Sequence, residues 1–66
     1  NYKAAKQNYN IVATRYPNSD KASRSVYQLY SIAKDVDKNT ALANQYKTKL
    51  LTQFPQSKEA KLFQKK

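Results

Sequence analysis

The stretch Tyr16-Pro17-Asn18-Ser19 returns 38 residues later as Phe54-Pro55-Gln56-Ser57, and these two corners decide the fold. Because the residue before a proline is pushed out of the α region, each proline predicts the end of a helix. The serine two residues further on can then cap a new helix. The two corners therefore divide the chain into helices joined by short connections.

Upstream of the first corner, apolar residues recur at helical spacing and share an arc of about 100°. This spacing predicts an amphipathic helix over residues 2–16 whose packing face consists of Tyr2, Ala5, Tyr9, Val12, Ala13 and Tyr16. A second helix is expected from about Asp20 to Asp35, with Ser19 or Asp20 as its N-cap. Its packing face consists of Ala22, Val26, Leu29, Tyr30, Ala33 and Val36, widened by Tyr27, and its opposite arc carries Lys21, Arg24, Ser25, Gln28, Ile32 and Asp35.

Between the two corners, residues 35–40 read as a tight connection in which Asp37 or Asn39 caps the next helix. That third helix is expected from about Thr40 to Phe54. Ser57 can cap a fourth helix over residues 58–66. The packing residues of these two helices are expected to be Leu42, Ala43, Tyr46, Leu50, Leu51 and Phe54, followed by Ala60, Leu62 and Phe63.

The composition supports helices and gives no sign of an enzyme. Glycine, which β-rich domains use for turns, is absent, and so are cysteine and histidine. The chain therefore lacks the commonest general base and the thiolate and imidazole metal ligands. The paired carboxylates Asp35 and Asp37 are assigned to a helix end and an N-cap, because a calcium loop needs further ligands. We predict no catalytic residue, no cofactor and no metal site.

A formal net charge of +9 raises the possibility of a nucleic-acid partner. The lysines are scattered singly, however, and the expected third helix offers only Lys47 and Lys49 as a basic recognition face. A solvated lysine-rich surface is therefore preferred, and a small basic helical nucleic-acid-binding domain is the alternative. No stretch approaches the roughly 18–20 apolar residues of a membrane span.

The similarity between the corners extends into the helices beside them. With the same 38-residue shift, Ala5 matches Ala43, Gln7 matches Gln45, Val12 matches Leu50, Thr14 matches Thr52 and Ala22 matches Ala60. A repeat of this length is typical of a solenoid built from helix pairs. At these residues the chain resembles the tetratricopeptide repeat family. Its aromatic-Pro-x-Ser corners are most similar to the bacterial envelope branch, which includes outer-membrane assembly lipoproteins, Tol-Pal coordinators and Bacteroidetes gliding or type IX secretion lipoproteins.

The resemblance assigns particular positions of the repeat to residues of this chain. Anchored on Pro55, it places the small position of the second helix on Ala43 and a later packing position on Leu50. The early aromatic of the first helix falls on Tyr27. The chain departs from the family pattern where Ser31 replaces a common glycine and where Lys34 and Lys47 replace common aromatics, and its inter-helix turn lacks the frequent glycine.

The resemblance also implies an organisation and a function. It makes residues 20–54 a complete helix pair, residues 2–16 the second helix of a preceding repeat and residues 58–66 the start of the next helix, within a longer protein. It implies a protein–protein interaction scaffold in the periplasm or at the outer membrane, held to the membrane only through a lipid anchor elsewhere. Partner proteins would bind the concave face or the repeat ends, and no small-molecule substrate is implied. The positions that line the concave face match Ser25, Gln28, Ile32 and Asp35.

Overall fold

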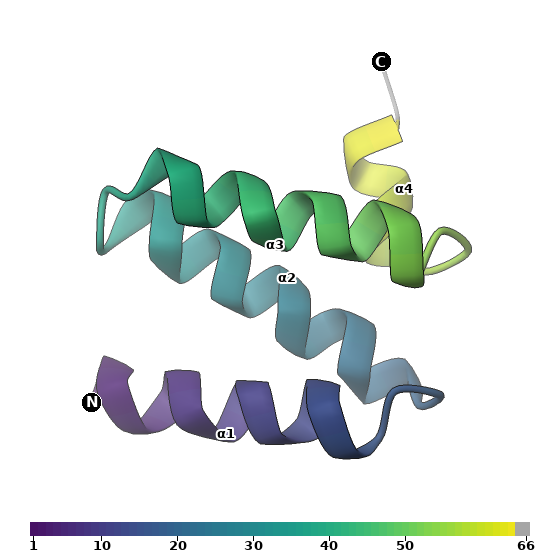
Figure 1. The fold of residues 1–66 in the computed structure, drawn as a ribbon, viewed down its shortest axis with the longest axis horizontal. Coiled ribbons are helices and arrows are strands. Elements are labelled where there is room, and N and C mark those ends of the chain that lie inside the picture. Colours follow the sequence, from purple (N-terminus) through teal and green to yellow (C-terminus); the bar gives the residue numbers. More distant parts are fainter. Residues whose placement is uncertain (65–66) are drawn as a thin grey trace.

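The computed structural model describes residues 1–64 and shows an all-α fold (Figure 1). Its helices are α1 (Tyr2–Arg15), α2 (Asp20–Asp35), α3 (Thr40–Gln53) and α4 (Lys58–Gln64). Adjacent helices pack in antiparallel pairs, and residues 1–64 contain no strand. The prediction of an all-α fold with antiparallel helix pairs is thereby confirmed, and the predicted helix bounds agree within one residue up to residue 64. Residues 65 and 66 of the predicted fourth helix lie outside the described part of the chain.

The two proline corners adopt the same backbone conformation. Tyr16 follows α1 with φ −126° and ψ 57°, and Phe54 follows α3 with φ −129° and ψ 53°. Each donates its N–H to the carbonyl four residues earlier, on Val12 and Leu50 respectively. The bounds of α3 are those of α1 shifted by 38 residues, as are the starts of α4 and α2. The sequence repeat is therefore also a structural repeat.

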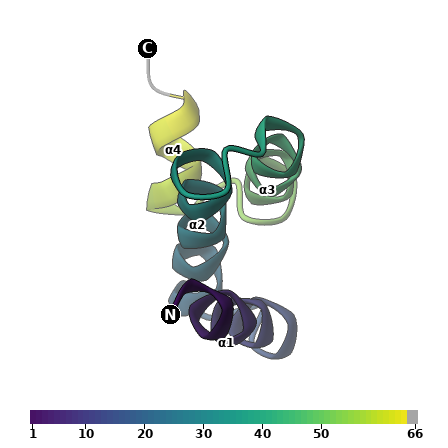
Figure 2. The same ribbon diagram turned by 90° about the vertical axis from the view of Figure 1, so that its left-hand side faces the viewer.

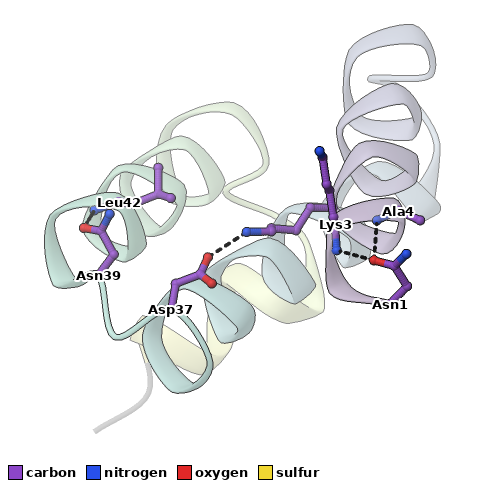
Figure 3. A network of polar contacts seen from close by, with 7 residues as sticks. Asn1, Lys3, Ala4, Asp37, Asn39 and Leu42 are labelled. Carbon is purple, nitrogen blue, oxygen red and sulfur yellow. Dashed lines mark hydrogen bonds and ion pairs between the residues drawn. The ribbon is translucent and has the colours of Figure 1, made fainter.

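An asparagine caps the N-terminus of each of the two matching helices α1 and α3. The Asn1 side chain accepts hydrogen bonds from the N–H groups of Lys3 and Ala4, and Asn39, 38 residues later, accepts from Leu42 (Figure 3). Side-chain oxygens at this position satisfy N–H groups that have no partner within the helix. Asn39, rather than Asp37, is thus the cap of α3.

The serine caps differ between the two corners. At the second corner, the Ser57 hydroxyl accepts the N–H of Ala60 at 3.0 Å, which confirms it as the cap of α4. At the first corner Ser19 occupies the N-cap of α2, but its side chain makes no capping hydrogen bond. The Ser19 hydroxyl donates to the carbonyl of Tyr16 at 3.0 Å, as the Ser57 hydroxyl does to that of Phe54 at 2.7 Å. The backbone carbonyl of Ser19 accepts the N–H of Ala22.

The connection between α2 and α3 closes without proline or glycine. Lys38 takes a positive φ of 54°, a conformation that costs an L-residue roughly 1–2 kcal/mol. The N–H groups of Asp37 and Asn39 donate to the carbonyls of Ile32 and Ala33, which satisfies the end of α2. The Asp37 carboxylate lies 2.8 Å from the ammonium group of Lys6, so this connection is also joined to the start of α1 (Figure 3).

Helix α2 is the centre of the molecule, because among the described residues it alone contacts the other three helices. It lies between α1 on one side and α3 and α4 on the other (Figures 1 and 2). Small residues allow this close approach, and Ala22, Ala33 and Ala43 are buried as expected, while Ala5 and Ser31 are half-buried. The buried apolar residues within positions 1–64 are Ala13, Ala22, Val26, Leu29, Ile32, Ala33, Ala43, Leu50 and Ala60.

Two groups of residues depart from the predicted faces. Tyr2, Tyr16, Val36 and Leu62 were expected to pack but are exposed. Ser25 and Ile32 were placed on the outer arc of α2 but are buried, with exposed fractions of 5% and 8%. These departures arise because α1 and α2 differ in the number of helices that pack against them. Helix α2 is covered from several directions and buries more than one face, whereas α1 packs against α2 alone among the described helices.

Candidate protein-interaction site

The predicted partner-binding residues of α2 do not share one surface. Gln28 and Asp35 are exposed, whereas Ser25 and Ile32 lie in the buried part of the helix. Ser25, Leu29 and Ile32 recur at spacings of four and three residues, which places them on one stripe, and all three are buried. The exposed edge of α2 is therefore rotated from the predicted one. It runs through Arg24, Gln28 and Asp35, with half-buried Ser31 between the last two.

A polar hollow of about 450 Å³ adjoins the start of this edge, where α2 meets α4. Its lining comes from the first turn of α2 and from the second corner with the start of α4. Three cationic side chains and two carboxylates surround the opening. The lining residues are Asp20, Lys21, Ser23, Arg24, Gln56, Ser57, Lys58 and Glu59.

One side-chain hydrogen bond joins α2 and α4 within the lining of this hollow. The hydroxyl of Ser23, which is only 5% exposed, lies 3.1 Å from a carboxylate oxygen of Glu59. It also lies 3.0 Å from the carbonyl of Asp20, so two acceptors share its single hydrogen. Because Ser23 and Glu59 are 36 residues apart, they meet only when α4 folds back beside α2. Sequence reasoning missed this pair, since nothing in the local pattern around Ser23 indicates a distant partner.

Further along α2, an aromatic cluster holds the same two helices together. The Phe63 ring packs against Tyr30 at a centroid distance of 4.8 Å and against Tyr27 at 5.8 Å. The ammonium groups of Lys34 and Lys47 lie over the Tyr30 and Phe63 rings at 5.9 and 5.4 Å. Such contacts contribute roughly 0.5–1 kcal/mol at exposed sites. Lys34 and Lys47, which stand where the tetratricopeptide resemblance expects aromatic side chains, therefore contact aromatic rings themselves.

The face formed by α2 and α4 is polar. Its exposed groups are guanidinium, ammonium, amide and carboxylate groups, which form hydrogen bonds and ion pairs with peptide groups and charged side chains. Within residues 1–64, no three potential metal-ligating side chains lie close enough together to hold an ion. No helix in this part of the chain has the length and apolar character needed to cross a bilayer.

A second hollow, of about 550 Å³, lies at the first corner. Val12 and Tyr16 give it an apolar wall, and Ser19, Asp20 and Lys21 complete the lining. The hollow is a separate feature from the polar one, although the start of α2 contributes to both. The side chain of Tyr16 beside it is 58% exposed.

Comparison with protein families, with curated proteins and with solved structures found no match. The tetratricopeptide resemblance therefore rests on the residues of this chain. The structure adds that the 38-residue period of the sequence is also the period of the helices, their asparagine caps and their proline corners.

Proposed function

We propose that this chain is a protein-interaction module of the tetratricopeptide type that binds segments of other proteins on the face formed by α2 and α4. The observation that carries the proposal is the repetition of helix, corner and cap at a fixed period of 38 residues. Proteins that stack such helix pairs present continuous surfaces for binding extended partners. A module of this kind needs exposed, chemically varied side chains on a rigid helical support.

The face between α2 and α4 supplies such side chains. Arg24, Gln28 and Asp35 are exposed along α2, and the polar hollow opens beside Arg24. The rigid support comes from Ser25 and Ile32, whose burial fixes the orientation of the helix. Of the four residues expected to contact a partner, Gln28 and Asp35 are retained as contacts, and Arg24 joins them.

The cellular location of the module is proposed from the sequences of its two proline corners. Tyr16-Pro17-Asn18-Ser19 and Phe54-Pro55-Gln56-Ser57 are similar to the repeat corners of bacterial envelope proteins. We infer a role as a scaffold in an assembly or secretion factor of the cell envelope, located in the periplasm or at the outer membrane. Partners in this role are proteins, and the module itself carries out no chemical step.

The net charge of +9 supports the second candidate, a nucleic-acid-binding domain. The two functions differ in their response to salt, because phosphate contacts release counterions and lose affinity steeply as salt is added. Submicromolar binding of a DNA or RNA duplex at about 0.15 M salt would favour this candidate over the scaffold.

The test of the scaffold begins with peptides selected on the intact chain from a random library displayed on phage. Selected peptides are titrated into the isotope-labelled chain, and the perturbed backbone amides are mapped by NMR. The proposal expects perturbations along residues 20–35 and 58–64. It also expects that Arg24→Glu weakens binding about tenfold, whereas Lys3→Glu, which changes an exposed lysine on α1 by the same net charge, does not. Perturbations confined to other helices would contradict it.

A further inference from the structure

We propose that the polar hollow between α2 and α4 binds an acidic segment of a partner protein, and that Ser23 prepares the hollow by holding the Glu59 carboxylate away from its cations. The inference rests on the proposed interaction function and adds the chemistry of the partner and a residue that acts without touching it. The hollow has a volume of about 450 Å³ and lies within the chain, between residues 20–24 and residues 56–59.

The cations that line this hollow are not neutralised. Arg24 on α2 and Lys58 on α4 supply one cation from each wall, and both side chains are exposed. Among the described residues the only ion pair joins Lys6 and Asp37, so neither of these cations is paired with a carboxylate. They are therefore available to carboxylates of a partner, with which guanidinium and ammonium groups form charge-assisted hydrogen bonds.

Glu59 belongs to the same lining, and its hydrogen bond to Ser23 keeps it from these cations. A Glu59 oxygen lies 3.1 Å from the hydroxyl of Ser23, a residue only 5% exposed. A bond to a carboxylate is stronger than one to a neutral carbonyl, so the hydroxyl favours Glu59 over the Asp20 carbonyl at 3.0 Å. Without that hydroxyl, Glu59 would pair with donors of the lining such as Arg24 and Lys58. Ser23 is therefore a positioning residue for the hollow.

The remaining polar groups of the lining favour a peptide over a nucleic acid. Asp20 and Gln56 contribute a carboxylate and an amide carbonyl, which accept hydrogen bonds. A peptide backbone brings N–H donors for these acceptors, whereas a phosphodiester group brings none and is repelled by Asp20. The net charge of +9 attracts acidic segments in general, and the hollow gives them a defined place.

The test uses the intact labelled chain and a short, end-blocked peptide of alternating glutamate and serine. A peptide of alternating glutamine and serine is its uncharged match, and NMR at about 0.15 M salt follows both titrations. We expect the acidic peptide to perturb the amides of residues 20–24 and 56–59 and to bind about fivefold more tightly than its match. Equal binding of the two peptides, or no binding at about 5 mM peptide, would overturn the proposal.

Variants of the two cations show whether the peptide binds in the hollow. Arg24→Gln and Lys58→Gln should each weaken the acidic peptide about threefold, as expected for one exposed ion pair. Lys3→Gln, which removes the same charge from an exposed residue of α1, should leave the affinity unchanged. An equal loss for all three variants would mean that the peptide senses only the net charge, which contradicts a site in the hollow.

A double-mutant cycle tests the role of Ser23. Ser23→Ala should weaken the acidic peptide about threefold, because Glu59 then competes for the cations. Glu59→Gln should strengthen it about threefold, and on that background Ser23→Ala should have no further effect. Asp37→Asn removes a carboxylate beyond the opposite end of α2 and should leave the affinity unchanged. Thermal melts establish that each variant is folded. An equal loss from Ser23→Ala on both backgrounds would overturn the positioning role.

The outcomes separate this inference from the proposed function. If library-selected peptides bind the α2–α4 face but are not acidic, and the glutamate peptide does not bind, the partner chemistry is wrong while the interaction function stands. Tighter binding of an oligothymidylate of equal charge would replace the peptide by a nucleic acid and overturn the inference. If the selected peptides do not bind the α2–α4 face at all, the proposed function itself is contradicted.

Discussion

The two proline corners have the same backbone and different surroundings. Tyr16 and Phe54 share their dihedral angles and their hydrogen bonds to the preceding helix. Phe54 packs against the core, whereas the side chain of Tyr16 is mostly exposed. Local sequence therefore sets the shape of each corner, and the number of neighbouring helices sets how much of it is buried.

The small residues after each corner behave alike, whereas the large residues before them do not. Ala22 and Ala60 are both fully buried, but only Leu50 of the pair Val12 and Leu50 is fully buried. The difference arises because α3 contacts both α2 and α4, whereas α1 contacts only α2 among the described helices. Within residues 1–64, the first corner is therefore covered by fewer helices than the second.

The largest effect is expected at Ile32, on the helix that joins the two corners. Ile32→Asp places an unpaired charge at a position only 8% exposed, which should cost several kcal/mol and unfold a chain of this size. Gln28→Asp, one turn away on the exposed edge, should change the free energy of unfolding by less than about 0.5 kcal/mol. Urea unfolding followed by circular dichroism measures both. A folded Ile32→Asp variant would show that this side of α2 is open.

Shortening the side chains of the matched residues Val12 and Leu50 to alanine tests whether the two corners differ in burial. Leu50→Ala should lower the free energy of unfolding by about 2–5 kcal/mol, because it removes buried methyl groups and leaves a cavity. Val12→Ala should cost about 1 kcal/mol or less, since half-buried Val12 already faces a hollow. Both are measured by urea unfolding at matched concentrations. Equal losses at the two positions would mean that the corners are equally covered.

The serines that follow the prolines give a smaller contrast. Ser57→Ala removes the hydroxyl that accepts the Ala60 N–H and should cost about 1 kcal/mol. Ser19→Ala removes only a hydroxyl bond to the Tyr16 carbonyl on an exposed residue, so its cost should be a few tenths of a kcal/mol. Shifts in the thermal midpoint report the difference. A larger loss at Ser19 would reverse the roles assigned to these two hydroxyls.

The connection between α2 and α3 provides the only expected gain in stability, and it is a small one. Lys38→Gly relieves the positive φ of Lys38 but makes the unfolded chain more flexible. These effects oppose each other, and the net result should be a stabilisation of about 0.5 kcal/mol. The urea midpoint should rise with an unchanged slope. Destabilisation would show that Lys38 is not strained in this turn.

Local signals allowed most of the fold to be predicted. Proline and serine act within a few residues, so the helices and the cap at Ser57 could be placed from the sequence, and the cap of α3 could be narrowed to Asp37 or Asn39. Burial on α2 could not, because it depends on which helices surround it. Ser25 and Ile32 are expected to be exposed if α2 packs through one face only. They are buried because α2 lies at the centre of the molecule and is contacted by the other three described helices.

The candidate site was predicted less well than the fold for the same reason. Gln28 and Asp35 were identified correctly as exposed residues of α2. The hollow beside them depends on a contact between Ser23 and Glu59, which lie on helices that the sequence cannot place side by side. Glu59 lies in the first turn of α4, where an acidic residue is favourable without any tertiary partner, so nothing local indicates its contact with Ser23.

Hydrogen exchange at two matched amides tests most directly the claim that one repeated unit occurs in a covered and an uncovered form. The N–H groups of Tyr16 and Phe54 make the same hydrogen bond at the same backbone angles. Because protection follows the free energy of local opening, the Phe54 amide should exchange at least about tenfold more slowly than that of Tyr16 after correction for intrinsic rates. Equal protection, or slower exchange at Tyr16, would contradict the account.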